Sequence, residues 1–174
     1  SWTTETLMVA DQNGDFDFEG ASREVSDLLP EAMTVWSVYR GQTGDEAART
    51  AILGSINEGK LIVNYIGHGA VDLWRGSVLT ATDAASLTNG SALPFVVGMT
   101  CLNGFFQTPY VESLAEALLK AENGGAVAVW TSSGLTNPAG QSLMNKGLVQ
   151  LLFNGEGRSL GEATAGAKAA TSDM

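Results

Sequence analysis

The chain has 174 residues, a length that suits one domain of ordinary size, and we expect residues 1–174 to form a single domain. Apolar residues make up 44% and charged residues 16% of the chain, a balance that excludes an intrinsically disordered protein. The net charge is −10 with no basic cluster, so we expect no nucleic-acid partner. The longest apolar runs are too short to span a membrane, and one cysteine excludes an internal disulfide.

The first part of the chain alternates short apolar runs with helical patterns. In chain order we predict a strand at 6–10, a helix at 21–29, a strand at 33–39, a helix at 44–58 and a strand at 60–67. Pro30 follows the first helix as a stop signal, and Gly59 follows the second as a C-terminal cap.

The second part of the chain continues the same alternation. We predict a strand at 92–100, a helix at 110–122, a strand at 124–132, a helix at 139–153 and a last helix that opens at 159–162. The dipeptide Asn137–Pro138 is typical of a helix start, and "SLGE" at 159–162 reads as a capping box. This order predicts an α/β fold with a mostly parallel central sheet and helices on both faces.

Three chemically capable residues follow the ends of predicted strands. They are Asp11, His68 and Cys101, and His68 is the only histidine of the chain. In open parallel sheets, functional groups gather at the carboxyl ends of the strands. Taken singly, the histidine is better explained as a satisfied polar group and the cysteine as a small core residue. Together, in the glycine-containing loops "GHGA" and "TCLNG", they favour a catalytic pair.

The chemistry of a thiol nucleophile explains this pairing. A thiolate is the reactive species, and a nearby imidazole can take the thiol proton and later give a proton to a leaving amine. The tetrahedral intermediate needs backbone N–H donors, which the amides of Gly69 and Cys101 are placed to supply as an oxyanion hole. Gly69 also has no side chain to block the approach of a substrate.

At these residues the chain resembles a known family. The stretches "LIVNYIGHGAVDLW", "LTNGSALPFVVGMTCLNGFF" and "SLAEALLKAENGGAVAVWTSSG" are similar to the gingipain family of cysteine peptidases. The resemblance implies a caspase-like three-layer sandwich, with Cys101 as the nucleophile and His68 as the acid/base. It also places Asp11 where the family has an acidic residue of the catalytic group, so that Asp11 either orients His68 or only caps the loop.

The acidic loop "DQNGDFDFE" has two further interpretations. Clustered oxygens suit a hard cation, so a structural calcium site is one hypothesis and a solvated turn is its alternative. The residues of that hypothetical calcium site are Asp11, Asn13, Asp15 and Asp17. The resemblance implies instead that this region selects the substrate: an inward Asp17 would favour a basic residue before the scissile bond, and an inward Phe18 an apolar one.

Other candidate substrate contacts come from the same resemblance and from strand ends. Trp74 matches a family tryptophan after the histidine loop and is expected either to wall the substrate cleft or to lie in the core. Ser132 and Ser133 follow the last predicted strand, where a polar loop can contact a bound peptide.

The function that we predict is a cysteine endopeptidase working through a Cys-His dyad and a thioester acyl-enzyme on a protein or peptide substrate. No cofactor is required for that chemistry. Two alternatives stay open: a sortase-like transpeptidase of the same family, and a catalytically silent binding copy. The resemblance implies a secreted or cell-envelope location. Family members continue past "GEATAGAKAA" into another strand, so we also expect a further C-terminal segment or flanking domains as partners.

Overall fold

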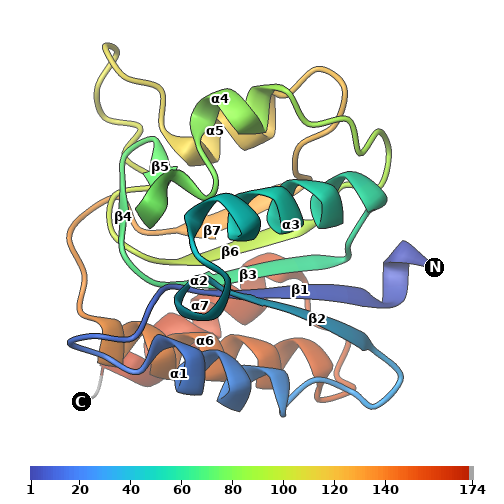
Figure 1. The fold of residues 1–174 in the computed structure, drawn as a ribbon. Coiled ribbons are helices and arrows are strands. Elements are labelled where there is room, and N and C mark those ends of the chain that lie inside the picture. Colours follow the sequence, from blue (N-terminus) through green and yellow to red (C-terminus); the bar gives the residue numbers. More distant parts are fainter. Residues whose placement is uncertain (173–174) are drawn as a thin grey trace.

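Five parallel strands form the central sheet of the computed structural model, which describes residues 1–172 (Figure 1). They lie in the order β2-β1-β3-β6-β7. Their bounds are Glu5–Ala10 (β1), Thr34–Tyr39 (β2), Ile62–Ile66 (β3), Phe95–Met99 (β6) and Ala128–Thr131 (β7). All five predicted strands are confirmed, and every neighbouring pair is parallel.

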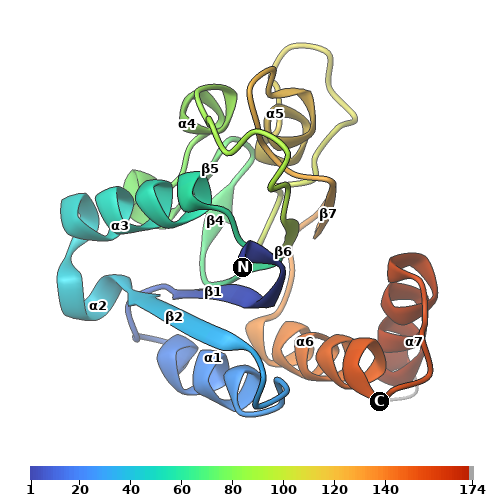
Figure 2. The same cartoon turned by 90° about the vertical axis from the view of Figure 1, so that its right-hand side faces the viewer.

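Helices cover both faces of this sheet, as Figures 1 and 2 show. One face carries α3 (Asp45–Glu58), α4 (Ala81–Ala85) and α5 (Leu114–Lys120). The other carries α1 (Phe18–Ser26), α6 (Pro138–Phe153) and α7 (Leu160–Ser172). Short elements complete the chain: α2 (Arg40–Thr43), the 3-10 segments η1 (Trp2–Thr4) and η2 (Arg75–Ser77), and the antiparallel pair β4 (Gly69–Ala70) and β5 (Leu73–Trp74). The predicted three-layer arrangement is therefore confirmed.

The three central strands β1, β3 and β6 are buried because side chains from both of their faces reach a helical layer. On β3, Val63 and Tyr65 belong to the core beneath α3 and α5, whereas Ile66 belongs to the core against α1 and α6. Successive residues of a strand point to opposite faces, so one apolar run supplies two cores. The central strands are thereby fixed in register, and so are the loops at their carboxyl ends.

Two helix starts differ from the prediction. The helix expected at 21–29 begins at Phe18, because the Asp17 side chain accepts a hydrogen bond from the Gly20 N–H and caps the helix. The helix expected at 110–122 begins only at Leu114, because Ser113 and Glu116 form a capping box there.

Two other helix starts are confirmed. The Asn137 side chain accepts hydrogen bonds from the N–H groups of Ala139 and Gly140, with Pro138 at the first helical position. Ser159 and Glu162 exchange the reciprocal hydrogen bonds of a capping box at the start of α7. Gly59, in the left-handed region at φ 92°, ends α3 as expected.

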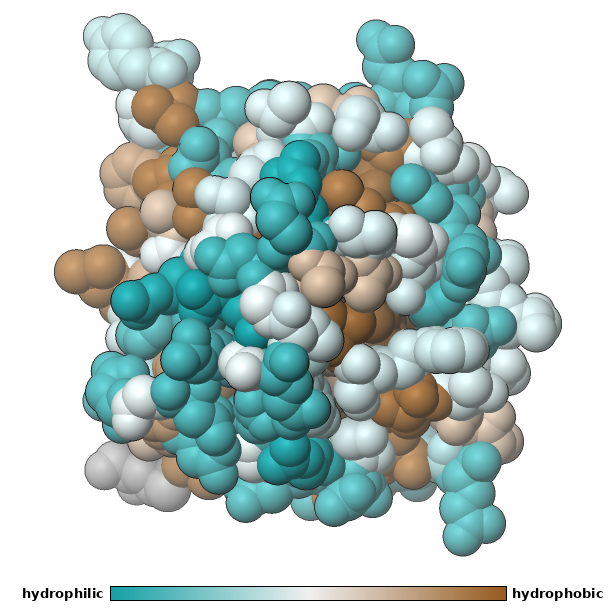
Figure 3. Space-filling model, in the orientation of Figure 1, coloured by the Kyte–Doolittle hydropathy of each residue, from teal (hydrophilic) through white to brown (hydrophobic). Residues whose placement is uncertain are grey.

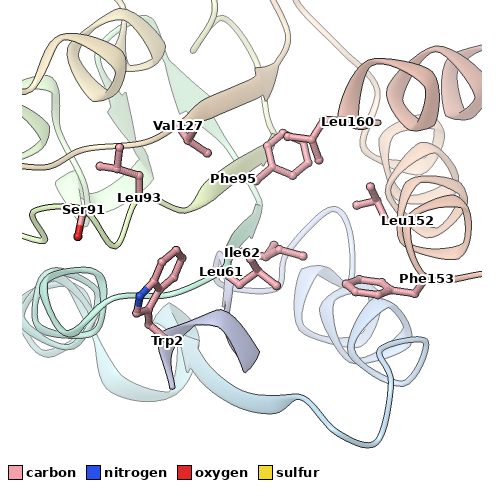
Figure 4. A pocket seen from close by; sticks show the side chains of 10 residues that line it. All are labelled: Trp2, Leu61, Ile62, Ser91, Leu93, Phe95, Val127, Leu152, Phe153 and Leu160. Carbon is pink, nitrogen blue, oxygen red and sulfur yellow. The ribbon is translucent and has the colours of Figure 1, made fainter. Parts of the chain in front are cut away.

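The two ends of the sheet differ in character. Near the amino ends of the strands lies an apolar cavity of about 430 Å³ (Figure 4). Its lining side chains are Trp2, Leu61, Ile62, Ser91, Leu93, Phe95, Val127, Leu152, Phe153 and Leu160. The carboxyl ends carry polar loops instead. Among the described residues, no helix is long and apolar enough to cross a membrane.

Candidate active site

His68 and Cys101 leave the sheet side by side. Strands β3 and β6 are neighbours, and their last matched residues are Ile66 and Met99. His68 and Cys101 are each the second residue after that pair, and the Gly67 N–H donates to the Met99 carbonyl across the gap. Because neighbouring strands lie about 4.8 Å apart, the two loops begin together at one edge. The expected placement at the carboxyl ends of adjacent strands is thus what the structure has.

The main chain of His68 is held on three sides. Its N–H donates to Asp11 Oδ2 at 3.1 Å. Its carbonyl accepts from the Tyr65 hydroxyl at 2.6 Å and from the Arg75 N–H at 3.0 Å. A glycine-flanked residue would otherwise sample many conformations, so these three bonds fix where the imidazole stands.

The imidazole itself meets two residues of the loop between β1 and α1. His68 Nε2 lies 3.2 Å from Asp15 Oδ1, and the Phe18 ring stands edge-on to the imidazole at a centroid distance of 5.1 Å. The His68 side chain is 35% exposed and Asp15 is 72% exposed. Sequence reasoning placed Asp15 only in the hypothetical calcium site, and its contact with the imidazole depends on the fold of a loop that has no periodic pattern.

The Asp11 carboxylate accepts a hydrogen bond from the main-chain N–H of His68 and is also paired with Arg40. Asp11 is 1% exposed, Arg40 Nη1 lies 2.8 Å from Asp11 Oδ1, and the same oxygen accepts from the Gln12 N–H. Arg40 Nε also contacts Asp45 at 2.7 Å. Partial burial acts to lower the pKa of Arg40, but the hydrogen bonds that it donates to Asp45 and Asp11 and the charges of these two carboxylates outweigh it, and the net shift is upward.

Arg40 was missed by sequence reasoning. The signal that could have found it is its position, because it directly follows the strand β2, as Asp11 follows β1. The registered pair Ala10 and Tyr39 brings the two following residues together at the same sheet edge.

The thiol of Cys101 contacts Thr136, which lies in another loop. Cys101 Sγ lies 3.4 Å from both the Thr136 N and Oγ1 and 3.8 Å from its carbonyl oxygen. The next residue, Leu102, has φ 63°, a left-handed conformation that is uncommon for a branched side chain. Within residues 1–172 the Cys101 N–H has no hydrogen-bond acceptor, which leaves it free for a substrate oxygen.

The histidine and cysteine loops contact each other directly. The Asn103 side chain donates to the carbonyls of Ala70 and Leu73, the latter at 3.1 Å. A Cβ on Gly69 would lie 2.5 Å from Thr100 Oγ1 and 3.1 Å from the Leu73 carbonyl oxygen. Position 69 therefore has to be glycine for the two loops to approach this closely.

The structure separates the two candidates for substrate selection in the acidic loop. Phe18 points inward and is buried at 1% exposure in the core cluster that also holds Ile66 and Met99. Asp17 points to its own helix: its Oδ1 accepts from the Gly20 N–H at 2.9 Å and from Asn13 Nδ2 at 2.7 Å. Phe18 is therefore a core residue and Asp17 a helix cap, and the choice between them as the substrate-selecting residue stays a prediction.

Trp74 is a core residue and not a cleft wall. It is 1% exposed and stacks on the Tyr65 ring at 4.2 Å with an interplanar angle of 8°. The cleft-wall interpretation is wrong, because no face of the indole is left for a substrate. This stack also holds Tyr65, whose pKa is raised well above its usual value, chiefly by burial and then by the charge of Asp11. The hydroxyl therefore stays a donor to His68.

Ser132 and Ser133 lie beside the thiol loop. With Thr136 they line a cavity of about 220 Å³ that extends toward α6 and α7. The Ser132 hydroxyl bonds within its own loop, to the Gly134 carbonyl at 3.0 Å, and the Ser132 carbonyl accepts from the Gly104 N–H at 2.9 Å. The serine loop is thus attached to the residues that follow Cys101.

The hypothetical calcium ligands do not fit a cation. Asp11 already has a guanidinium partner, Asp17 caps a helix, and Asn13 bonds the Asp17 side chain and the Glu19 N–H. A search of residues 1–172 finds no group of three His, Cys, Asp or Glu side chains arranged to hold a metal ion. We therefore derive no step through calcium.

Comparisons with known proteins agree with this geometry. The model of the family described as "Peptidase family C25" matches residues 1–174. Gingipain R2 and gingipain R1 of Porphyromonas gingivalis are each 34% identical to the chain over 121 residues, which is 65% of the chain. Those residues make up only 16% and 12% of the two relatives, so the chain spans a small part of their length.

Solved structures show the same fold. The crystal structure of the Arg-specific cysteine proteinase gingipain R superimposes with a TM-score of 0.88 at 24% identity, covering 99% of this chain and 42% of that one. A complex of the pro- and mature domains of RgpB from P. gingivalis gives a TM-score of 0.88 at 23% identity over 99% of this chain and 44% of that one. The caspase-like fold expected from the resemblance is therefore shown.

Proposed function

Since the chain belongs to peptidase family C25, a family of cysteine peptidases, we propose that it cleaves peptide bonds with Cys101 as nucleophile and His68 as acid/base. The observation that carries the proposal is the register of β3 and β6, which starts the two catalytic loops at matched positions. If Cys101 were only a core residue and His68 only a surface residue, nothing would require both to lie at the carboxyl ends of β3 and β6.

The proposed reaction needs only side chains and water. The Cys101 thiol gives its proton to His68, and the thiolate sulfur bonds to the carbonyl carbon of the substrate. The carbonyl oxygen takes the negative charge, which the N–H groups of Gly69 and Cys101 would stabilise. Collapse of this intermediate breaks the C–N bond, and the leaving amine takes the proton from His68. Water then hydrolyses the thioester, with His68 as its base, and the thiol is restored.

Two acidic residues serve the histidine differently in this proposal. Asp15 contacts the imidazole and would stabilise its protonated form after the thiol is deprotonated. Asp11 holds the main chain of the same residue and acts by positioning. The Asp11 role expected from the resemblance thus divides between two residues of one loop.

Active-site labelling tests the proposal. We would treat the protein with peptidyl electrophiles that carry Arg, Lys, Leu, Phe, Asp or Ala before the warhead and compare intact masses. Wild type should gain one adduct, Cys101→Ala none, and His68→Ala one that forms at least about 100-fold more slowly, because general acid–base catalysis contributes about that much. Ser91→Ala, at the opposite end of the sheet, is the matched surface control and should label like wild type.

The outcomes also decide between the open alternatives. A folded protein that shows no Cys101-dependent adduct with any electrophile would contradict the peptidase proposal and favour a silent binding copy. Product analysis with an added amine separates hydrolysis from transfer, because a transpeptidase would join the amine to the acyl product. The likeness to gingipains also supports the proposal that the protein acts outside the cell or at its envelope.

A further inference from the structure

A polar cavity of about 350 Å³ lies beside His68. Its lining residues are Asp11, Gln12, Asn13, Gly14, Asp15, Arg40, His68 and Arg75. Hydrophilic residues also gather at the lower left of the face in Figure 3, over α1 and the loop that leads into it. A cavity that shares the catalytic histidine is placed to receive a substrate side chain.

Most polar side chains of this cavity already have partners. Asp11 is paired with Arg40, and Arg40 is shared with Asp45 outside the cavity. Asp15 is paired with His68. Asn13 uses both ends of its amide, one on Asp17 and one on the Glu19 N–H. The carboxylates of Asp11 and Asp15 therefore both have partners within the protein.

Two hydrogen-bond donors of the cavity remain. Among residues 1–172, neither the Arg75 guanidinium nor the Gln12 side-chain amide has a hydrogen bond or an ion pair with another side chain. A guanidinium is always charged and presents a planar fork that matches a carboxylate. The hydrogen-bonding groups of the cavity that lack side-chain partners are thus donors, and the stronger of them, the Arg75 guanidinium, is positively charged.

The main chain around Arg75 is held close to the catalytic residue. The Arg75 N–H donates to the His68 carbonyl at 3.0 Å. The next residue, Gly76, has φ 77°, and a Cβ there would collide with the side chains of Arg40 and Asp45. Arg75 therefore starts from a fixed position, and only its flexible side chain has to adjust to a ligand.

We propose that this cavity binds the carboxylate of an aspartate or glutamate side chain next to the scissile bond, with Arg75 as the main donor and Gln12 as a second. The inference rests on the proposed peptidase function and names its substrate class. A basic side chain fits less well, because it would face Arg40 and Arg75 and would compete with His68 for Asp15. The chain's net charge of −10 repels acidic peptides at long range, but at 0.15 M salt such effects decay within about 8 Å.

The first arm of the test is cleavage. Fluorogenic peptides would carry Asp, Glu, Asn, Gln, Ala, Lys or Arg either just before or just after the scissile bond, and kcat/KM would be measured at 0.15 M salt. In wild type we expect about 10-fold higher kcat/KM for Asp or Glu than for the matching amide at one of the two positions. Arg75→Gln should bring that ratio close to one, and Arg75→Glu should shift the preference to Lys or Arg.

Arg158→Gln is the matched control, because it removes the same charge from the turn between α6 and α7, where Arg158 pairs with Glu156. It should keep the wild-type ratio. Equal cleavage of the acid and amide peptides by wild type would overturn the proposal. So would a preference for Lys or Arg, or an acid preference that survives in Arg75→Gln.

The second arm is binding, and it separates the two proposals. Isothermal titration of the Cys101→Ala variant with the uncleaved Asp or Glu peptide and its amide twin needs no catalysis. If wild type cleaves nothing, the peptidase proposal fails, but tighter binding of the acidic peptide that is lost in Cys101→Ala/Arg75→Gln would still support the carboxylate site. Equal binding of the two peptides would overturn that site.

Discussion

The His68 and Cys101 loops of the candidate active site are built in different ways, although they start from matched positions on neighbouring strands. The His68 main chain is fixed by Asp11, Tyr65 and Arg75, and two of these bonds come from buried side chains. Within residues 1–172, the hydrogen-bond contacts of the Cys101 thiol are all with Thr136, a partly exposed residue of another loop, and Cys101 is followed by the left-handed Leu102. The main chain of His68 is thus positioned by core residues, whereas the surroundings of the Cys101 sulfur depend on a surface loop.

The largest expected effect comes from removing the charge behind the histidine. Arg40→Met leaves the Asp11 carboxylate buried without its cation, which should cost about 3 kcal/mol of unfolding free energy. Urea denaturation measures the loss. Arg158→Met is the control, since Arg158 forms an exposed pair with Glu156 and should change stability by no more than about 0.5 kcal/mol. Equal effects of the two variants would show that the core does not position the histidine loop.

The next effect concerns the bond to the His68 carbonyl. Tyr65→Phe keeps the stack on Trp74 but removes a 2.6 Å hydrogen bond, so we expect a loss of about 1 kcal/mol and a lower kcat with little change in KM. Tyr110→Phe serves as the control, because this tyrosine is 91% exposed. A Tyr65→Phe enzyme with wild-type kcat would mean that the other two bonds suffice to hold the loop.

On the cysteine side we expect a small change in stability and a clear one in reactivity. Thr136→Val removes the hydroxyl beside the sulfur and keeps the N–H contact. Alkylation of Cys101 by iodoacetamide at pH 7 should slow about threefold, the effect of losing part of one hydrogen bond. Thr108→Val, in the loop after the cysteine, is the control. Should alkylation proceed at the wild-type rate, the thiol would not depend on the surface loop.

The smallest effect is a pH dependence of stability that comes from the start of helix α5, where the His68 and Cys101 loops both contact this helix. The N–H groups of Leu114 and Ala115 donate to the carbonyls of Val71 and Asn103. The pKa of Glu116 is lowered by hydrogen bonds from the Ser113 main chain and side chain and by Lys120. Since its folded pKa lies below the unfolded one, its contribution is present above about pH 4.3 and disappears as pH falls through the folded pKa.

Thermal unfolding of wild type and Glu116→Gln at several pH values checks this expectation. The two should differ at pH 7 and converge as the pH falls through the lowered folded pKa, below which the carboxyl group is protonated in both states. A difference that stays constant down to pH 2 would contradict the capping-box origin of the shift. Glu122→Gln is a suitable control, because Glu122 lies beyond the end of α5.

The fold and the placement of the catalytic pair could be predicted because they follow from patterns in the chain. Apolar runs of strand length alternate with helical spacing, and parallel strands gather their carboxyl ends at one edge. These two patterns are enough to place His68 and Cys101 at the same edge of the sheet. Helix starts at Asn137 and Ser159 were equally accessible, because a cap is a local hydrogen bond that residue types specify.

The surroundings of the pair could not be predicted, because they depend on side-chain directions in loops. Asp15 and Asp17 look alike in the sequence, yet one meets the imidazole and the other caps α1. Arg40 stands far from Asp11 in the chain, and only the register of β1 and β2 pairs them. The sequence left Trp74 equally open as a cleft wall or a core residue, and only the short β4-β5 hairpin, which turns it back onto Tyr65, decides for the core.

The common direction of the five strands has a practical consequence for handling the enzyme. The loops that carry Asp15, His68 and Cys101 lie at one end of the sheet, whereas the exposed Ser91 lies beside the apolar cavity at the other end. A dye, an affinity handle or a solid support attached at Ser91 would leave the catalytic end facing the solution. Immobilised protein should therefore process large substrates as readily as free protein does, which makes this face the natural anchor for a biosensor.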